Sequence, residues 1–324
     1  MPYNMGVGSQ LAIGKESAWG TPVADTQLIN FLSESLDSAV SKVEEESLLA
    51  AKAAAAYDLM GIRVAGDFSA ILKPETAGML LKAALGGTDT VVQNSGGVTG
   101  QHQHTIIAQT ASGTTPSYTL IVNRKQAIKR YAGCKVDTCK LAAKVGDYVR
   151  ITLSVKGKDE STGTVTSTAN PSKKAYKFIG GTLTMGGTAV DVTGVDLEIA
   201  NGLDDGVQVN TSGIYSSEPV HGKRKITLSV EMPYDTNAES IRNANLLTEA
   251  VLSTVVLHLE SPEIIAVASK YRMDITLANV AIQEAKVNVG GVSLLTMSIK
   301  GEATAVGATE PITAVVYDGI NTAY

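Results

Sequence analysis

The twelve residues "GDYVRITLSVKG", numbered 146–157, have a near copy later in the chain, "GGVSLLTMSIKG", numbered 290–301. Five positions keep the same residue type at a constant offset of 144: Gly146, Thr152, Ser154, Lys156 and Gly157. Polar and apolar residues alternate in the phrase, which predicts a strand that is buried on one face. The repetition therefore predicts that one β unit occurs twice in this chain.

The segments upstream of the two phrases share an order of elements. Residues 64–87 show an alternating strand, a proline at the first helical turn, and a helix that a glycine pair ends. The apolar face of that helix comprises Ala77, Leu80, Leu81, Ala84 and Leu85. Residues 223–251 repeat the order, with Thr236 and Glu239 spaced as a capping box after a proline. This shared order supports the duplication.

The halves differ in their connections. Residues 88–116 are rich in Gly, Thr, Gln and Ser, which predicts an inserted surface loop. Residues 42–60 have a high helix propensity, whereas the corresponding residues 201–222 have no helix signal. We interpret both as long connections between two strands, with either a loop or one helical turn in the first. Long loops in a compact domain usually carry a function.

Composition excludes several classes of protein. The formal net charge is −5 and no long Lys/Arg-rich block occurs, which argues against a protein that binds nucleic-acid phosphates. No signal peptide opens the sequence and no run of about 18 apolar residues could span a membrane. Cys134 and Cys139 are expected on opposite faces of one strand and reduced, in a protein made in the cytosol.

No catalytic constellation is recognisable, so we expect no enzyme, no metal and no cofactor. His102 and His104 could share one face of a strand, but no cysteine or acidic ligand lies nearby, and a solvated loop explains them better than zinc. Asp204 and Asp205 provide too few oxygen ligands to argue for calcium. Two β units with long acidic loops instead indicate a protein that works by assembling.

Residues 11–23, "LAIGKESAWGTPV", resemble the opening of phage tail tube proteins. The resemblance rests on Gly14-Lys15-Glu16, Trp19-Gly20 and Thr21-Pro22, and the order strand, helix, strand in both halves is similar to the fold of that family. In the family each tube domain is a β-sandwich with one flanking helix. Six domains close a ring whose inner strands form a continuous barrel, and the rings stack into a tube.

The resemblance implies a mainly β protein with two tandem domains of the tail tube type, each a sandwich or barrel with one flanking α-helix. The expected organisation is an N-terminal arm (1–30), a first domain (31–160), a linker (161–172), a second domain (173–305) and a C-terminal arm (306–324). Three chains with two domains each would complete a pseudo-sixfold ring. The expected partners are the chain itself and the tail initiator or baseplate, tape measure and tail terminator proteins, while DNA crosses the lumen without specific binding and no membrane is involved. The expected location is the tail of the virion.

Nine residues are our candidates for contacts between subunits or rings, taken from the two long loops, the N-terminal arm and the C-terminal tail: Glu44, Glu45, Glu46, Leu48, Leu49, Asp204, Asp205, Trp19 and Tyr317. Acidic or neutral residues are expected to line the lumen. Two alternatives stay open. One is another ring component of the virion, such as a tail terminator or decoration protein. The other is a carbohydrate-binding β-sandwich, which the shortage of aromatic residues disfavours.

Overall fold

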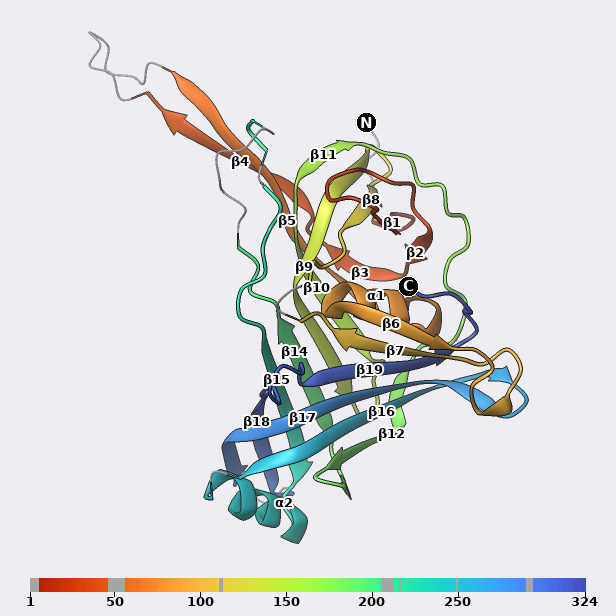
Figure 1. Ribbon diagram of the computed structural model, residues 1–324, viewed down its shortest axis with the longest axis vertical. Helices are drawn as coiled ribbons and strands as arrows, with labels where there is room; N and C mark the ends of the chain where they lie inside the picture. The colour runs from red at the N-terminus through yellow and green to blue at the C-terminus, as the bar shows by residue number, and fades with distance from the viewer. Residues whose placement is uncertain are drawn as a thin grey trace.

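The chain is mainly β, as expected. The computed structural model describes residues 6–45, 56–110, 113–204, 213–215, 217–248, 250–289 and 294–324. These residues form 19 strands in one large antiparallel sheet that bends into layers, together with helices α1 and α2 (Figure 1).

Eight strands form the main sheet in the order β4–β5–β10–β9–β14–β15–β18–β17. Their bounds are β4 Asp37–Glu44, β5 Tyr57–Ile71, β10 Arg150–Gly157, β9 Ile128–Lys144, β14 Gly194–Ala200, β15 Lys225–Pro233, β18 Thr296–Ala303 and β17 Ser269–Asn288. All seven neighbouring pairs are antiparallel. The two halves of the chain thus contribute four adjacent strands each, joined where β9 pairs with β14.

The repeated phrase occupies the same place in each half. Strand β10 lies between β5 and β9, and β18 lies between β15 and β17. Val155 pairs with Gly66 of β5, and Ile299, at the offset of 144, pairs with Val230 of β15. Residues 290–293 of the second phrase lie outside the described residues.

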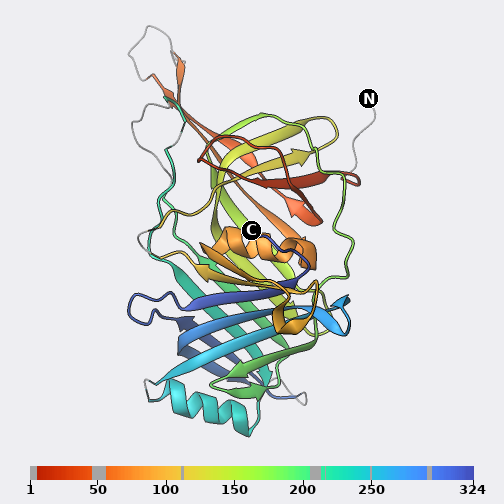
Figure 2. The ribbon, with the colours of Figure 1, turned by 45° about the vertical axis from the view of Figure 1, so that its right-hand side comes forward.

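Two further layers cover one side of the main sheet (Figure 2). In the first half they comprise β1 (Gln10–Lys15), β2 (Gln27–Ile29), β8 (Tyr118–Asn123) and β11 (Asp159–Thr162), while β3 (Phe31–Glu34) pairs with β5. In the second they comprise β16 (Val251–Ala266), β12 (Lys177–Met185), β13 (Thr188–Val190), β19 (Ile312–Asp318), β7 (His102–Ala108) and β6 (Gly86–Val92). Strands β9 and β17 are long because each begins in a covering layer and ends in the main sheet.

Helix α1 (Pro74–Leu85) confirms the first helix prediction. Every residue except Glu75 is buried, because the helix lies between β9 and the layer of β6, β7 and β19. Gly86 ends it in the left-handed conformation, with φ 76°. Asn201 Nδ2 donates to the carbonyl of Ala84 at 2.9 Å, and Arg224 Nε donates to Asn201 Oδ1 at 2.8 Å. The second half of the chain therefore caps the helix of the first.

Helix α2 (Thr236–Ile241) is where we expected the second helix, but its predicted cap is wrong. Asp235 is the N-cap, and its Oδ1 accepts a hydrogen bond from the Ala238 N–H at 2.8 Å. Glu239 does not reach back to the cap because its carboxylate accepts from the Tyr234 hydroxyl instead. A π-helical turn, Arg242–Leu246, continues α2. No helix in the described part of the chain is long and apolar enough to cross a membrane.

The predicted surface loop at 88–116 is wrong. Strands β6 and β7 occupy most of it, with a 3₁₀ turn at Ser95–Gly97 between them. Strand β7 pairs on one side with β6 and on the other with β19, near the end of the chain. The polar composition of this segment does not predict strands, because β7 is stabilised by pairing with β19, about 200 residues away in sequence.

A β-bulge in β9 overturns the expected placement of the cysteines. The ladder between β10 and β9 shifts between Ser154 and Val155, which leaves Asp137 without a partner in β10. The extra residue inverts the alternation of faces, so that Cys134 and Cys139 both enter the same core. Both thiols are free and buried.

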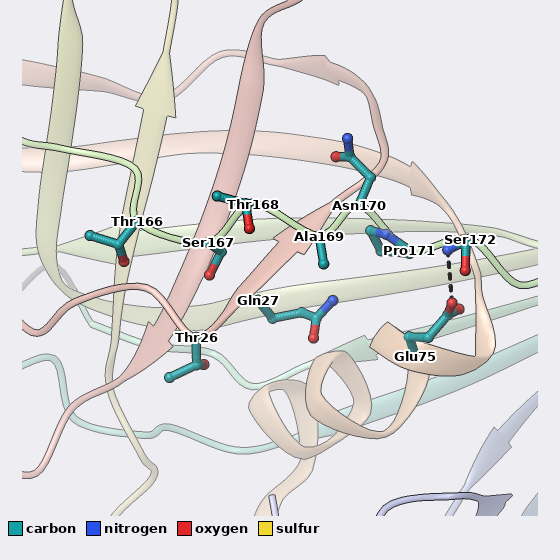
Figure 3. A pocket seen from close by; sticks show the side chains of 10 residues that line it. All are labelled: Thr26, Gln27, Glu75, Thr166, Ser167, Thr168, Ala169, Asn170, Pro171 and Ser172. Carbon is teal, nitrogen blue, oxygen red and sulfur yellow. Dashed lines mark hydrogen bonds between the residues drawn. The ribbon is translucent and has the colours of Figure 1, made fainter.

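The predicted linker at 161–172 is held against the first half of the chain (Figure 3). Both carboxylate oxygens of Asp25 accept backbone hydrogen bonds, one from Thr166 at 2.8 Å and one from Ser167 at 2.7 Å. Glu75 Oε1 accepts from the backbone of Ser172 and Lys173, each at 2.8 Å. These contacts fix the path of the segment between the halves.

Candidate assembly interface

The β4–β5 hairpin extends away from the body of the molecule (Figure 1). The strands pair from Asp37 and Ala65 outward to Glu44 and Tyr57, and the Glu45 N–H donates to the Ala56 carbonyl at 3.0 Å. The outer part of the hairpin carries five large apolar side chains that are between 40% and 64% exposed: Val40, Val43, Tyr57, Leu59 and Met60. Apolar side chains grouped on a projecting hairpin indicate a surface that another molecule covers.

The long connection after β14 supports the hairpin from the side. The Ile62 N–H donates to the Ile214 carbonyl at 2.8 Å, and Ile62 forms a parallel bridge with Tyr215. At the base of this connection, Asp204 Oδ1 accepts from the Val220 N–H at 2.8 Å. The two loops that sequence analysis selected as interface candidates therefore lie together.

The main sheet has two free edges. Among the described residues, β4 pairs only with β5, and β17 from Ile282 to Asn288 pairs only with β18. Val40 on the first edge is 49% exposed, although its side chain is apolar. Val287 on the second edge is only partly buried. Unpaired strand edges invite pairing with another chain.

A family model for phage tail tube proteins matches residues 6–260, which is most of the chain. The chain belongs to the phage tail tube protein family. This finding confirms the resemblance at residues 11–23 and assigns the protein to a family of structural components of the phage tail, not enzymes. No curated protein matches the chain.

The structure describes five of the nine interface candidates: Glu44, Glu45, Asp204, Trp19 and Tyr317. Glu44 lies at the outer end of β4, where its Oε2 accepts from the Tyr57 hydroxyl at 3.3 Å. Asp204 lies at the base of the supporting loop. Glu46, Leu48, Leu49 and Asp205 lie outside the described residues.

Trp19 of the tail tube protein is held within the chain. Its indole N–H donates to the Gly133 carbonyl at 3.0 Å, and the Lys158 ammonium lies 5.2 Å from the ring centroid. Beside it, the buried carboxylate of Glu16 accepts four hydrogen bonds of 2.7–2.9 Å. The donors are the backbone N–H groups of Gly20 and Gly133 and the hydroxyls of Ser117 and Thr119. The residues that carry the family resemblance thus hold the first half of the fold together.

Tyr317 lies apart from the hairpin, in β19 of the covering layer. The Arg272 guanidinium lies 3.8 Å from the centroid of its ring, which is half-buried. The nine candidates therefore do not form one surface. The exposed apolar residues of the hairpin and the edge residues Val40 and Val287 were not among the candidates, although the apolar positions within residues 40–60 are visible in the sequence.

The histidines expected in a solvated loop lie in β7 instead. His104 is completely buried, with Nδ1 3.1 Å from Asp89 Oδ2 and Nε2 2.8 Å from the Ile320 carbonyl. Burial lowers the pKa of His104, but hydrogen bonds with Asp318 and Asp89 outweigh it and raise the pKa to about 10. The imidazolium at neutral pH therefore joins two buried aspartates. Within the described ranges no group of three or more His, Cys, Asp or Glu side chains could hold a metal ion.

Proposed function

We propose that this protein is the subunit of the hollow tail tube, that three chains close each ring with pseudo-sixfold symmetry, and that phage DNA passes through the stacked rings. The observation that carries this proposal is the β9–β14 pairing inside the chain. It joins the two four-strand halves edge to edge, over seven residue pairs from Gly194–Lys144 to Ala200–Thr138. The strands that correspond to β14 and β9 at the outer ends of the sheet are β4 and β17.

The correspondence follows from the ladders. Val40 of β4 pairs with Ile62 of β5, and Ile199 of β14 pairs with Ile226 of β15. The ladders to β10 and β18, aligned by the repeated phrase, make Ile62 equivalent to Ile226. Val40 is therefore equivalent to Ile199. On the other side, Cys139 of β9 pairs with Leu153 of β10, and Val287 of β17 pairs with Met297 of β18. Met297 is the counterpart of Leu153 at the offset of 144, so Val287 is equivalent to Cys139. Because Ile199 pairs with Cys139, the same register places Val40 opposite Val287 of a neighbouring chain.

The side chains support this register. Ile199 and Cys139 at the internal junction are each 1% exposed and point into the core. Val40 and Val287, the corresponding edge residues, are also apolar, yet Val40 is 49% exposed in the single chain. Pairing the two edges between chains would bury both and remove two unpaired strand edges. A heterologous contact of this kind closes a ring when its rotation is a whole fraction of a turn.

The proposed organisation keeps the expected boundaries, with tandem tube domains at 31–160 and 173–305. Arms at 1–30 and 306–324 flank them, and the segment 161–172 connects them. Two domains per chain and six per ring require three chains. Partners of such a tube are the initiator or baseplate at one end, the tape measure protein inside and the terminator at the other end. Synthesis in the host cytoplasm would precede assembly.

Cysteines at the two edges test the ring. In a Val40→Cys/Val287→Cys variant, Cα atoms across an antiparallel pair would lie about 4.5–5.5 Å apart, within the range of a disulfide. We expect mild oxidation of assembled protein to give covalent species that end at three chains on a non-reducing gel. The native cysteines do not interfere because both are buried.

The matched control is Val40→Cys/Val267→Cys, since Val267 is 91% exposed in the turn between β16 and β17, away from the proposed junction. It should remain uncross-linked. Species of up to six chains, or equal cross-linking of test and control, would contradict the trimer. Negative-stain microscopy of the same samples separates a tube from the alternatives, because a terminator or decoration protein would give single rings or caps.

The hairpin is proposed to contact the next ring. Deleting residues 44–56 should leave the far-ultraviolet circular dichroism spectrum and the unfolding midpoint nearly unchanged, because the described residues of this range, Glu44, Glu45 and Ala56, are exposed and belong to no core cluster. Polymerisation into tubes should be lost, as measured by sedimentation and microscopy. Tubes of normal length from this variant would exclude a role in stacking.

A further inference from the structure

In the described part of the chain, the covering layers lie on one face of the main sheet and leave the other face open (Figure 2). Along β14 the buried residues Val195, Leu197 and Ile199 alternate with Asp196 and Glu198, which point to the opposite, open face. The same alternation continues across β10, β15 and β18. Charged side chains of both signs populate this face, which we call the open face.

Five lysines on the open face are paired with carboxylates, whereas Lys144 at the end of β9 forms no ion pair with a described residue. Lys140 Nζ lies 3.5 Å from Glu198 Oε2, and these residues are direct cross-strand partners on β9 and β14. Lys225 Nζ lies 3.6 Å from Glu302 Oε2 between β15 and β18. One ion pair thus joins β9 to β14, and the other joins β15 to β18.

The pattern extends to the edge of the sheet and to the first half of the chain. Glu284 of β17 pairs with Lys286 on its own strand and with Lys300 of β18, the latter at 3.4 Å. The Lys286 hydrogen bond is the largest influence on Glu284 and lowers its pKa, so the carboxylate stays ionised at neutral pH. In the first half, Lys156 Nζ lies 3.5 Å from Asp137 Oδ2.

Stability alone does not account for these pairs. Lys140, Lys225, Lys286 and Lys300 are between 58% and 72% exposed, and such surface pairs contribute about 0–1 kcal/mol each. Their common effect is on charge, because every lysine in the set has a carboxylate within 4 Å. A polyanion that approaches such a lysine meets the carboxylate as well.

The open face would line the lumen of the proposed tube. When a sheet closes into a ring, the outside has the longer circumference, so the side that carries α1 and the covering layers belongs outside. This step rests on the proposed function. From the sequence we expected acidic or neutral residues to line the lumen. The surface facing DNA would instead carry lysines, most of which have a carboxylate partner within 4 Å.

We propose that the ion pairs of the open face keep its lysines from binding the phosphates of a passing DNA duplex. Affinity for DNA arises mainly when free cationic side chains displace the counterions condensed on phosphates. A lysine already paired with a carboxylate must lose that partner first, and the carboxylate then repels the phosphate. DNA can therefore move past lysine side chains without being held.

Removing carboxylates tests the proposal. A Glu198→Gln/Glu302→Gln variant leaves Lys140 and Lys225 without their anionic partners and preserves side-chain size. Tubes of this variant, incubated with a short fluorescent DNA duplex and sedimented, should retain at least about tenfold more duplex than wild-type tubes at about 50 mM salt. The difference should fall steeply with added salt, because binding to freed lysines releases counterions.

The control is Asp191→Asn/Glu263→Gln, which removes the same number of negative charges from the covering layer, after β13 and in β16, where neither carboxylate forms an ion pair with a described residue. Its tubes should retain no more duplex than wild type. Equal retention by the two variants would assign the effect to overall charge and overturn the proposal, as would wild-type levels in both. Microscopy is done first, so that failure to form tubes counts against the proposed function and not against the ion pairs.

Discussion

Replacing Glu16 with alanine should destabilise the unassembled chain by about 3–5 kcal/mol. Glu16 is 7% exposed and its carboxylate accepts from Gly20, Gly133, Ser117 and Thr119, so its removal leaves three buried donors and the half-buried Gly20 N–H without this acceptor. The substitution also removes the link between residues 16–20 and two segments, at 117–119 and 133, that lie more than 100 residues away from Glu16 in sequence. Urea unfolding followed by circular dichroism measures the loss.

Two further variants distinguish the loss of the buried hydrogen bonds from the loss of a negative charge as the cause of the lower free energy of unfolding. Glu16→Gln keeps the shape, but its amide nitrogen would face N–H or O–H donors, so it should recover only part of the lost free energy of unfolding. Glu198→Ala removes an exposed carboxylate and should change the free energy of unfolding by less than about 1 kcal/mol. A loss for Glu16→Ala no larger than that for Glu198→Ala would show that the buried network is not what holds the first half together.

Elements governed by short-range patterns were predictable from sequence. Helix α1 has a proline at its start, an apolar face and a left-handed glycine at its end, and all three signals act within 14 residues. The closing strands β10 and β18 were recognisable because alternating burial requires alternating residues. Residues 11–23 identified the family, although their role proved to be packing around Glu16 and not contact with a partner.

Features governed by distant partners were not predictable. Strand β7 is polar at His102, Gln103 and His104, and it is a strand because β19 pairs with it from the other end of the chain. The bulge at Asp137 inverts the faces of β9 and leaves no mark in the residue pattern. The candidate interface depended on register in the same way, because only the ladders identify Val40 and Val287 as edge residues.

Raising the pH from 6.5 to 10 should weaken the attachment of the C-terminal segment. His104 has a pKa of about 10 in the folded chain, above its ordinary value of 6.5. The folded state therefore holds the proton more tightly, and the resulting stability is complete below pH 6.5 and lost as the pH rises through 10. The whole contribution to the free energy of unfolding is on the order of 5 kcal/mol.

The attachment runs through Tyr324. Its backbone N–H donates to Asp89 Oδ2 at 2.8 Å, its hydroxyl donates to Asp318, and its ring lies 4.6 Å from the His104 ring. The Lys15 ammonium also donates to the Tyr324 carbonyl at 2.8 Å. Hydrogen exchange of residues 312–324 should accelerate with pH more than exchange in β14 does, after correction for the intrinsic rate.

The His104→Gln variant provides the reference. It lacks the titrating group and should be less stable than wild type at pH 6.5, with the difference in free energy of unfolding shrinking toward pH 10. His258→Gln is the matched control, because His258 is 24% exposed and lies in β16, which pairs with β12 and β17 and not with β7 or β19. A gap between wild type and His104→Gln that stayed constant with pH would mean that the His104 side chain contributes through packing, and that its charge does not hold Asp89 and Asp318 together.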